Sequence, residues 1–83
     1  LGQNFPNPFN PSTMIGFQLP KEGFVSLVIF NSSGEKVAEP VFGYLAAGEH
    51  KIVFNATDLP SGIYLYKLTA GNATATKKMI LLR

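Results

Sequence analysis

Residues 61–70 constrain the fold more than any other part of the chain, because a glycine is followed there by a run of β-branched, aromatic and aliphatic side chains. Side chains alternate between the two faces of a strand, so Tyr64, Tyr66 and Leu68 share one face and the residues between them share the other. Both faces are largely apolar. This predicts a central strand that is covered on two sides, or on one side with a partner on the other. Gly62 should allow a sharp entry into this strand.

The rest of the chain has the pattern of short strands separated by turns. Gly71-Asn72 is a strong signal for a two-residue hairpin turn into the last strand. Pro40 is expected to separate two short strands. The four consecutive apolar residues at 79–82 break the alternation, which predicts burial on both faces or a register slip at a bulge. The expected strands are residues 13–19, 24–30, 35–39, 41–45, 49–54, 63–70 and 73–83.

About seven short strands with turn signals between them, and no stretch with a helical period, predict an all-β fold. We expect an antiparallel β-sandwich without helix, and a small open barrel is the alternative. The Pro/Asn-rich residues 1–12 should form an extended, ordered arm, and residues 13–83 a single sandwich domain. Phe5 and Phe9 are expected to pack on the edge of the domain, or alternatively to contact a partner.

Composition narrows the function classes. The chain has 83 residues, which suffices for one small domain, and it has no cysteine, so disulfides and thiolate metal sites are excluded. The net charge is only +2 and 14% of the residues are charged, so the dense basic stripe that a nucleic-acid-binding protein needs is missing. No apolar run reaches the length of a transmembrane helix, and no signal-peptide pattern begins at Leu1. We therefore expect a mature fragment or a module of a larger protein.

Catalytic chemistry is not predicted. His50 is the single histidine and Asp58 the single aspartate, and no two carboxylates have a spacing that brings them together. His50 is interpreted as a solvated strand residue. The sequence contains neither a phosphate-binding glycine loop nor the clustered Asp/Asn loop that calcium prefers, so we expect no enzyme, metal or cofactor.

Aromatic side chains that could be exposed suggest two further functions for the chain. A carbohydrate-binding accessory module could stack sugars on the candidates Phe42, Tyr44, Tyr64 and Tyr66, although tryptophan is missing. A self-assembling subunit of a surface fibre could use the edge strands and the Pro-rich arm. In that case an apolar stripe on the outer face of the second strand marks an interaction surface. The candidate assembly surface consists of Phe5, Phe9, Phe24, Val28 and Phe30.

Three motifs occur in a fixed order, and together they resemble a known family. They are Pro6-Asn7-Pro8-Phe9-Asn10-Pro11 near the start, Gly62-Ile63-Tyr64-Leu65-Tyr66 late in the chain, and Lys77-Lys78-Met79-Ile80-Leu81-Leu82-Arg83 at the end. Gly34 and Ala47-Gly48 extend the likeness to nearly the whole chain. The chain resembles the type A C-terminal sorting domain of the type IX secretion system, a bacterial route across the outer membrane.

The resemblance implies an immunoglobulin-like sandwich that follows a passenger protein. It further implies recognition by type IX secretion components in the periplasm, passage across the outer membrane, and cleavage by a sortase-like cysteine peptidase before or within the arm. The passenger would then be released, or attached to surface lipopolysaccharide. A final strand could also extend a partner's sheet. The recognition residues that the resemblance implies are Asn7, Pro8, Gly62, Tyr64, Lys78, Met79, Ile80, Leu81, Leu82 and Arg83.

Overall fold

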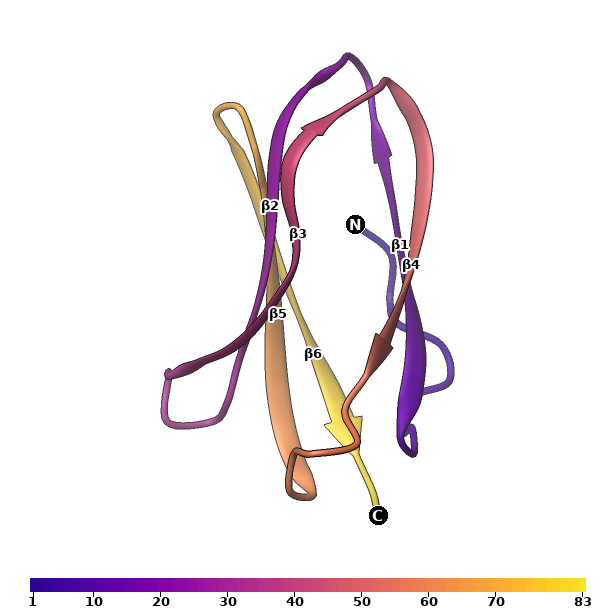
Figure 1. Ribbon diagram of the computed structural model, residues 1–83, viewed down its shortest axis with the longest axis vertical. Coiled ribbons are helices and arrows are strands. Elements are labelled where there is room, and N and C mark those ends of the chain that lie inside the picture. The colour runs from indigo at the N-terminus through magenta and orange to yellow at the C-terminus, as the bar shows by residue number, and fades with distance from the viewer.

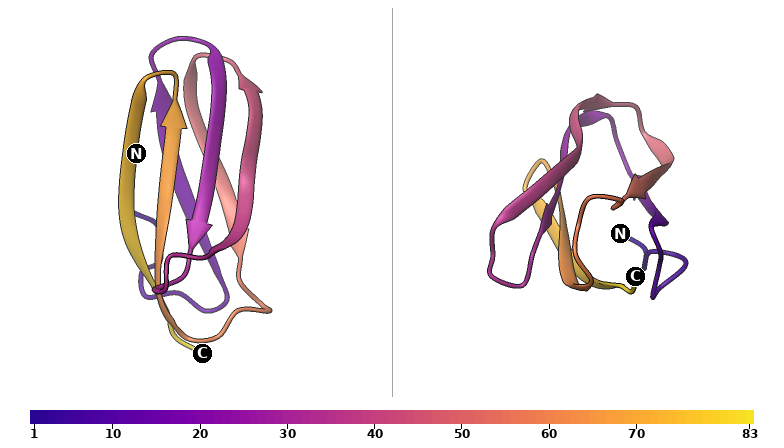
Figure 2. Two further views of the ribbon diagram at one scale, coloured as in Figure 1. Left: turned by 90° about the vertical axis from the view of Figure 1, so that its left-hand side faces the viewer. Right: turned by 60° about the horizontal axis from the view of Figure 1, so that its bottom comes forward.

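Two antiparallel sheets face each other across a shared apolar core in the computed structural model, which describes residues 1–83 (Figures 1 and 2). The predicted all-β sandwich without helix is confirmed, with six strands in place of about seven. One sheet pairs β1 (Ser12–Leu19) with β4 (Gly48–Asn55). The other has four strands in the order β3 (Lys36–Leu45), β2 (Gly23–Phe30), β5 (Gly62–Ala70) and β6 (Ala73–Leu81).

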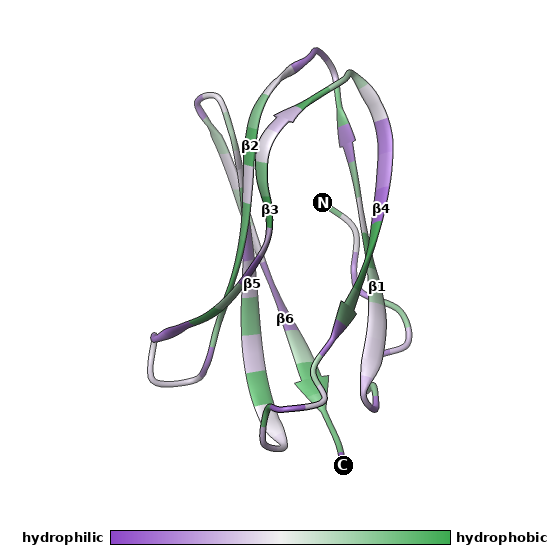
Figure 3. Ribbon diagram, viewed as in Figure 1, coloured by the Kyte–Doolittle hydropathy of each residue, from purple (hydrophilic) through white to green (hydrophobic).

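The alternation that is visible in the sequence determines which side chains enter the core. Every second residue of β1, β2 and β5 is buried, and bands of apolar residues follow both sheets in Figure 3. Burial of these side chains is the main driving force for folding. The buried apolar members from the three strands are Ile15, Phe17, Leu19, Val25, Leu27, Ile29, Tyr64, Tyr66 and Leu68.

Pro40 does not separate two strands, so that prediction is wrong. β3 runs through it as one strand. Between the Leu27–Val41 pair and the Ile29–Ala38 pair, β3 contains one residue more than β2, which is the geometry of a β-bulge. β3 lies at the edge of its sheet, where a residue without an N–H group removes no ladder hydrogen bond. Pro40 is therefore accommodated in this edge strand by a bulge and does not end the strand.

β5 is covered on one face only. Tyr64, Tyr66 and Leu68 point into the core, as predicted. Ile63 and Leu65 on the opposite face are 48% and 39% exposed, so the prediction of cover on both sides is wrong for the domain by itself. The outer face of the four-stranded sheet thus carries apolar side chains in contact with solvent.

The last hairpin follows the predicted turn chemistry. Ala70 pairs with Ala73, which leaves Gly71 and Asn72 as a two-residue loop. Gly71 has φ +58° and no residue other than glycine has a positive φ. These signs match a type II′ turn, whose first central position favours glycine.

The end of β6 keeps strict alternation. β5 and β6 pair without a register shift. Met79 and Leu81 are fully buried, whereas Ile80 is half-buried and Leu82 is 55% exposed. The predicted burial on both faces, or slip in register, is therefore wrong.

We predict a large difference between two truncations of aliphatic strand residues. Ile29→Ala removes a side chain with no exposed surface and should lower the free energy of unfolding by about 2–5 kcal/mol. Val53→Ala, on the outer face of β4, should cost less than about 1 kcal/mol. Urea unfolding of both variants measures the difference. Equal decreases in the free energy of unfolding would contradict the assignment of Ile29 to the core and Val53 to the surface.

Candidate recognition site

The N-terminal arm, residues 1–11, lies along the free edge of β1. The Phe5 and Met14 backbones exchange two hydrogen bonds, Phe5 N–H to Met14 O at 3.0 Å and Met14 N–H to Phe5 O at 2.9 Å. Nearer the N-terminus, Gly2 N–H donates to Gly16 O at 2.8 Å. The arm therefore acts as a third, irregular strand of the two-stranded sheet.

The same arm continues to the end of β6 in the other sheet. Phe9 N–H donates to Ile80 O at 2.9 Å, and Leu82 N–H donates to Phe9 O at 3.0 Å. The side-chain oxygen of Asn7 accepts a hydrogen bond from Ile80 N–H at 2.9 Å. Figure 2 shows the arm passing between β1 and β6. It closes this side of the sandwich.

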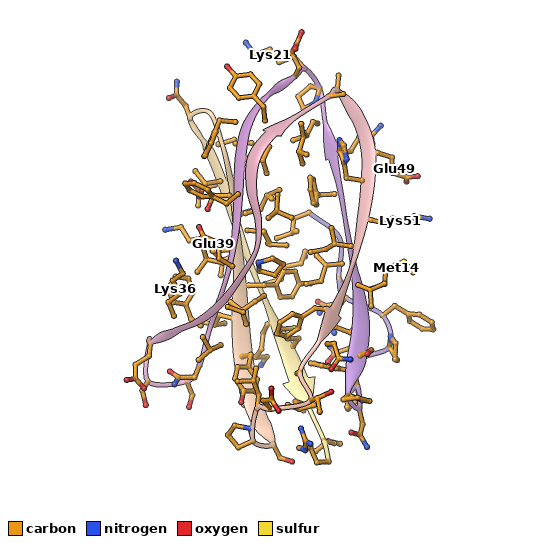
Figure 4. The ribbon with its side chains drawn as sticks, in the orientation of Figure 1. Met14, Lys21, Lys36, Glu39, Glu49 and Lys51 are labelled. Carbon is orange, nitrogen blue, oxygen red and sulfur yellow. The ribbon has the colours of Figure 1, made fainter.

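The two phenylalanines of the arm have opposite environments. Phe9 is buried in the core, which confirms the prediction that it packs on the domain. Phe5 is 80% exposed, so the same prediction is wrong for this residue. Its backbone partner Met14 lies on the outer face of β1, as Figure 4 shows, and the side chain of Phe5 has no core to enter.

Tyr66 connects the four-stranded sheet to the arm across the core. Its fully buried hydroxyl donates to Gly2 O at 2.8 Å and accepts a hydrogen bond from Asn4 N–H at 2.8 Å. Burial raises the pKa of Tyr66 above its ordinary value of 10.0, and the hydrogen bond from Asn4 lowers it in part. The bond to Gly2 O requires the protonated hydroxyl, whereas the oxygen accepts the Asn4 N–H in either state, so deprotonation removes one of the two contacts with the arm.

The side chain of Asn4 stabilises the turn of the arm. Its Nδ2 group donates to Thr13 Oγ1 at 2.9 Å and to Pro6 O at 3.1 Å, and the Thr13 hydroxyl donates to the same carbonyl at 2.9 Å. Asn4 and Thr13 are both buried, and no buried side-chain polar atom lacks a partner. The arm therefore has one fixed path.

The start of β5 and the C-terminal residues meet beside the arm. Gly62 pairs with Leu81, and Arg83 N–H donates to Ser61 Oγ at 3.0 Å. The guanidinium of Arg83 donates to two carbonyl groups of residues 56–61 at 2.8 and 3.0 Å. The terminal arginine thus connects β6 to the loop that leads into β5.

The residues with an implied recognition role fall into two groups. Tyr64, Met79 and Leu81 are buried, and the Tyr64 hydroxyl donates to Pro60 O at 2.6 Å. In the folded domain these three side chains position the surface and do not form it. Ile80 is half-buried. The exposed members are Asn7, Pro8, Gly62, Lys78, Leu82 and Arg83.

Sequence reasoning missed the residues that fix the arm, namely Asn4, Thr13 and the hydroxyl of Tyr66. The alternation of side chains predicted that Tyr66 lies in the core, but it did not identify a hydrogen-bond partner for the hydroxyl. A buried tyrosine hydroxyl usually finds a hydrogen bond, so this position carried a signal that something polar had to lie across the core. Nothing in the local sequence identifies Asn4 as that partner.

A second surface lies on the outer face of the four-stranded sheet. Phe24 is 45% exposed there, and Val28 and Phe30 are half-buried, while Phe9 lies in the core and does not contribute. The Phe24 ring packs edge-to-face on Phe42 with centroids 4.9 Å apart. Farther along β2 and β3, an ion pair of 2.8 Å joins Lys36 and Glu39, both of which lie outward in Figure 4.

The four aromatic candidates for a sugar-stacking platform have different environments. Two of the four candidates, Tyr64 and Tyr66, are buried in the core. Phe42 and Tyr44 are exposed, and their rings lie edge-on to the Phe24 ring at 88° and 72°. The predicted platform is therefore wrong for Tyr64 and Tyr66, and sugar stacking on Phe42 and Tyr44 stays a prediction.

The histidine has structural contacts. The His50 ring stacks on Phe17 with centroids 5.4 Å apart, and its Nε2 lies 2.8 Å from Ala46 O. No three His, Cys, Asp or Glu side chains are grouped as they would be around a metal ion. The structure contains no helix of a length and hydropathy that would cross a membrane.

We predict that Tyr66→Phe loosens the arm. The substitution leaves Asn4 N–H without its acceptor, and a buried unpaired group costs about 1–3 kcal/mol. Unfolding in urea and amide exchange at Asn4 should both report the loss. Tyr44→Phe is the matched control, because its hydroxyl has no hydrogen bond and is exposed to solvent. Equal stability of the two variants would contradict the bridging role.

The raised pKa of Tyr66 also predicts a loss of stability in alkali. The unfolded chain releases the tyrosine proton at a lower pH than the folded chain. The stabilisation that the Tyr66 hydroxyl gives the folded state is therefore complete below about pH 10 and is lost as pH rises through the folded pKa. Unfolding measured between about pH 8 and 11 should show a steeper decline for Tyr44→Phe than for Tyr66→Phe. Parallel declines would contradict the assignment.

Comparison with known proteins agrees with the resemblance of the three motifs. The model of the family described as secretion system C-terminal sorting domain matches residues 3–82, from the arm to the end of β6. A search of curated proteins finds no match. Since the family match covers nearly the whole chain, including the arm that closes the sandwich, the chain belongs to the family of C-terminal sorting domains of the type IX secretion system.

Proposed function

We propose that this domain directs the export of an N-terminal passenger by presenting a folded recognition surface to the type IX secretion machinery. Family membership supports the role of a C-terminal sorting signal, and the family is a targeting family and not a catalytic one. In this proposal the domain crosses the periplasm with its passenger. The passenger finally reaches the cell surface or the medium.

The observation that carries the proposal is the convergence of three motifs that are far apart in the sequence. The Asn7 side chain binds the Ile80 backbone, and Arg83 binds Ser61, next to Gly62. Each motif is weak by itself as a signal. Because these contacts bring the three motifs together near the end of β6, we propose that a receptor reads the folded domain and rejects an unfolded one.

The exposed groups define the kind of partner that fits this surface. Lys78 and Arg83 contribute positive charge, Leu82 an apolar side chain and Asn7 a polar one. An acidic surface with an apolar centre would complement them. The backbone of residues 80–82 already pairs with the arm, so we propose recognition mainly through side chains at this point and not through addition of a strand.

The arm also bears on the cleavage step. In the proposed pathway a sortase-like cysteine peptidase releases the domain and the passenger is freed or attached to lipopolysaccharide. Backbone hydrogen bonds at Gly2, Phe5 and Phe9 hold the arm in place. Proteases act on segments that are free of such bonds. We therefore propose a cleavage site before Gly2.

Export of a fused passenger tests this function. Deletion of residues 78–83 would remove the core side chains of Met79 and Leu81, so a surface variant is preferable. Lys78→Glu with Leu82→Ser should trap the passenger in the periplasm, because a loss of about 1–2 kcal/mol in binding free energy weakens binding about 5- to 30-fold. Fractionation of cells and medium measures the outcome.

The matched control makes the same chemical changes on the other sheet. Lys51 and Val53 lie on the outer face of β4, opposite Gly16 and Met14. Lys51→Glu with Val53→Ser should leave export unchanged. Normal export of the terminal variant, with a fold shown to be intact, would contradict the proposal.

Self-assembly into a surface fibre is the second candidate, and the outer face of the four-stranded sheet favours it. Phe42 and Tyr44 are 69% and 75% exposed there. The fibre hypothesis predicts that mass in light scattering grows with concentration and that Phe42→Ser abolishes the growth. The sorting proposal predicts a monomer at all concentrations.

A further inference from the structure

A cavity of about 730 Å³ lies next to the arm, where the sandwich is not closed. It is bounded by the end of β1 and the turn that follows, and by the hairpin of β5 and β6. Small side chains on β6 leave it open, and apolar side chains of both sheets form much of its wall. The lining residues that matter here are Leu1, Gln18, Leu19, Leu68, Ala73 and Ala75.

Free backbone groups lie along the β1 rim of this cavity. The N–H and C=O groups of Met14 point toward the arm and bind Phe5, and the carbonyl of Gly16 binds Gly2. Backbone groups point to the same side at every second residue of a strand, so those of Gln18 are next in this row. The arm residues of the structure provide no partner for them.

The β6 rim has the same arrangement. Ile80 binds the arm through its backbone, and Lys78 O accepts a hydrogen bond of 2.8 Å from the Gln3 side chain. The next positions in this row are Thr76 and Thr74, which are exposed and make no bond to the arm. The arm fills one part of the groove between β1 and β6. Beyond Gly2 the groove continues between two unpaired strand edges, at Gln18 of β1 and at Thr76 and Thr74 of β6.

The arm already points into this continuation. It runs antiparallel to β1, so backbone that precedes Gly2 is directed toward Gln18. Leu1 is half-buried and forms part of the cavity wall. Since side chains alternate along an extended segment, the residue two positions before Leu1 would share its inward face.

We propose that the residues which precede Leu1 in the exported protein extend the arm as an edge strand along β1 and place one apolar side chain in this cavity. The inference rests on the proposed function, under which a passenger is joined to the arm. A segment joined to Leu1 has a high effective concentration at the groove, which favours it over a second copy or a separate peptide. The residue two positions before Leu1 is then apolar, and the site accessible to the peptidase lies before this added strand.

Amide hydrogen exchange in the full exported protein tests the proposal. The probe is the Gln18 amide, which should be protected when the segment pairs with β1. Replacement of the residue two positions before Leu1 by Asp should accelerate exchange at Gln18 on the order of tenfold. The matched control places Asp immediately before Leu1, where the side chain faces outward, and should leave the exchange rate unchanged.

Rapid exchange of Gln18 in the unaltered protein would overturn the proposal, because no strand would then cover the groove. Equal exchange in the two Asp variants would also overturn it, since the cavity would not receive the inward side chain. These results are distinct from failure of the sorting function. If exchange contradicts the extension while Lys78→Glu with Leu82→Ser still blocks export, the added strand is wrong and the export signal stands.

Discussion

The contact of the Tyr66 hydroxyl with the arm is the interaction on which the rest of the structure depends. Two strands cannot cover a four-stranded sheet, so the inner faces of β5 and β6 would lie open beside β1. The arm fills this place with the side chain of Phe9, and Tyr66 fixes the arm from the opposite sheet through Gly2 and Asn4. An N-terminal segment of irregular structure is in this way part of the core.

This arrangement brings together motifs that lie more than 70 residues apart in the chain. The Phe9 backbone pairs with Ile80 and Leu82, so the terminal strand has its final geometry only when the arm is in place. Buried residues of the motifs, such as Met79, position the backbone of the candidate site, and exposed residues such as Lys78 place charged or apolar groups on its surface. Under the proposed function, a sorting signal built in this manner depends on the folding of the domain.

The regular part of the fold could be predicted from the sequence because it depends on local patterns. Alternation identified the inward faces of β1, β2, β4 and β5, and the Gly71-Asn72 pair identified the last turn. The effect of Pro40 could not be predicted, because it depends on whether the strand lies at the edge of a sheet. Burial of β5 on a single face likewise depends on whether a further layer covers the outer face of the four-stranded sheet.

The candidate site was only partly predictable for a related reason. Its exposed residues came from motifs that are recognisable as a set, but the bonds that join them connect distant positions. Tyr66 and Asn4 are 62 residues apart, and no local pattern relates them. The different environments of Phe5 and Phe9 also follow from pairing with two different sheets, which is a property of the assembled sandwich.

The most direct measurement of the central claim is site-directed photo-cross-linking during export. A photoreactive residue is placed at position 82, at the end of the sandwich where the motifs converge, or at position 53, on the outer face of β4. Both positions are exposed, so neither substitution removes a core contact. The account predicts a cross-link to an export component from position 82 and none from position 53. Cross-linking from position 53 alone, or equally from both, would contradict it.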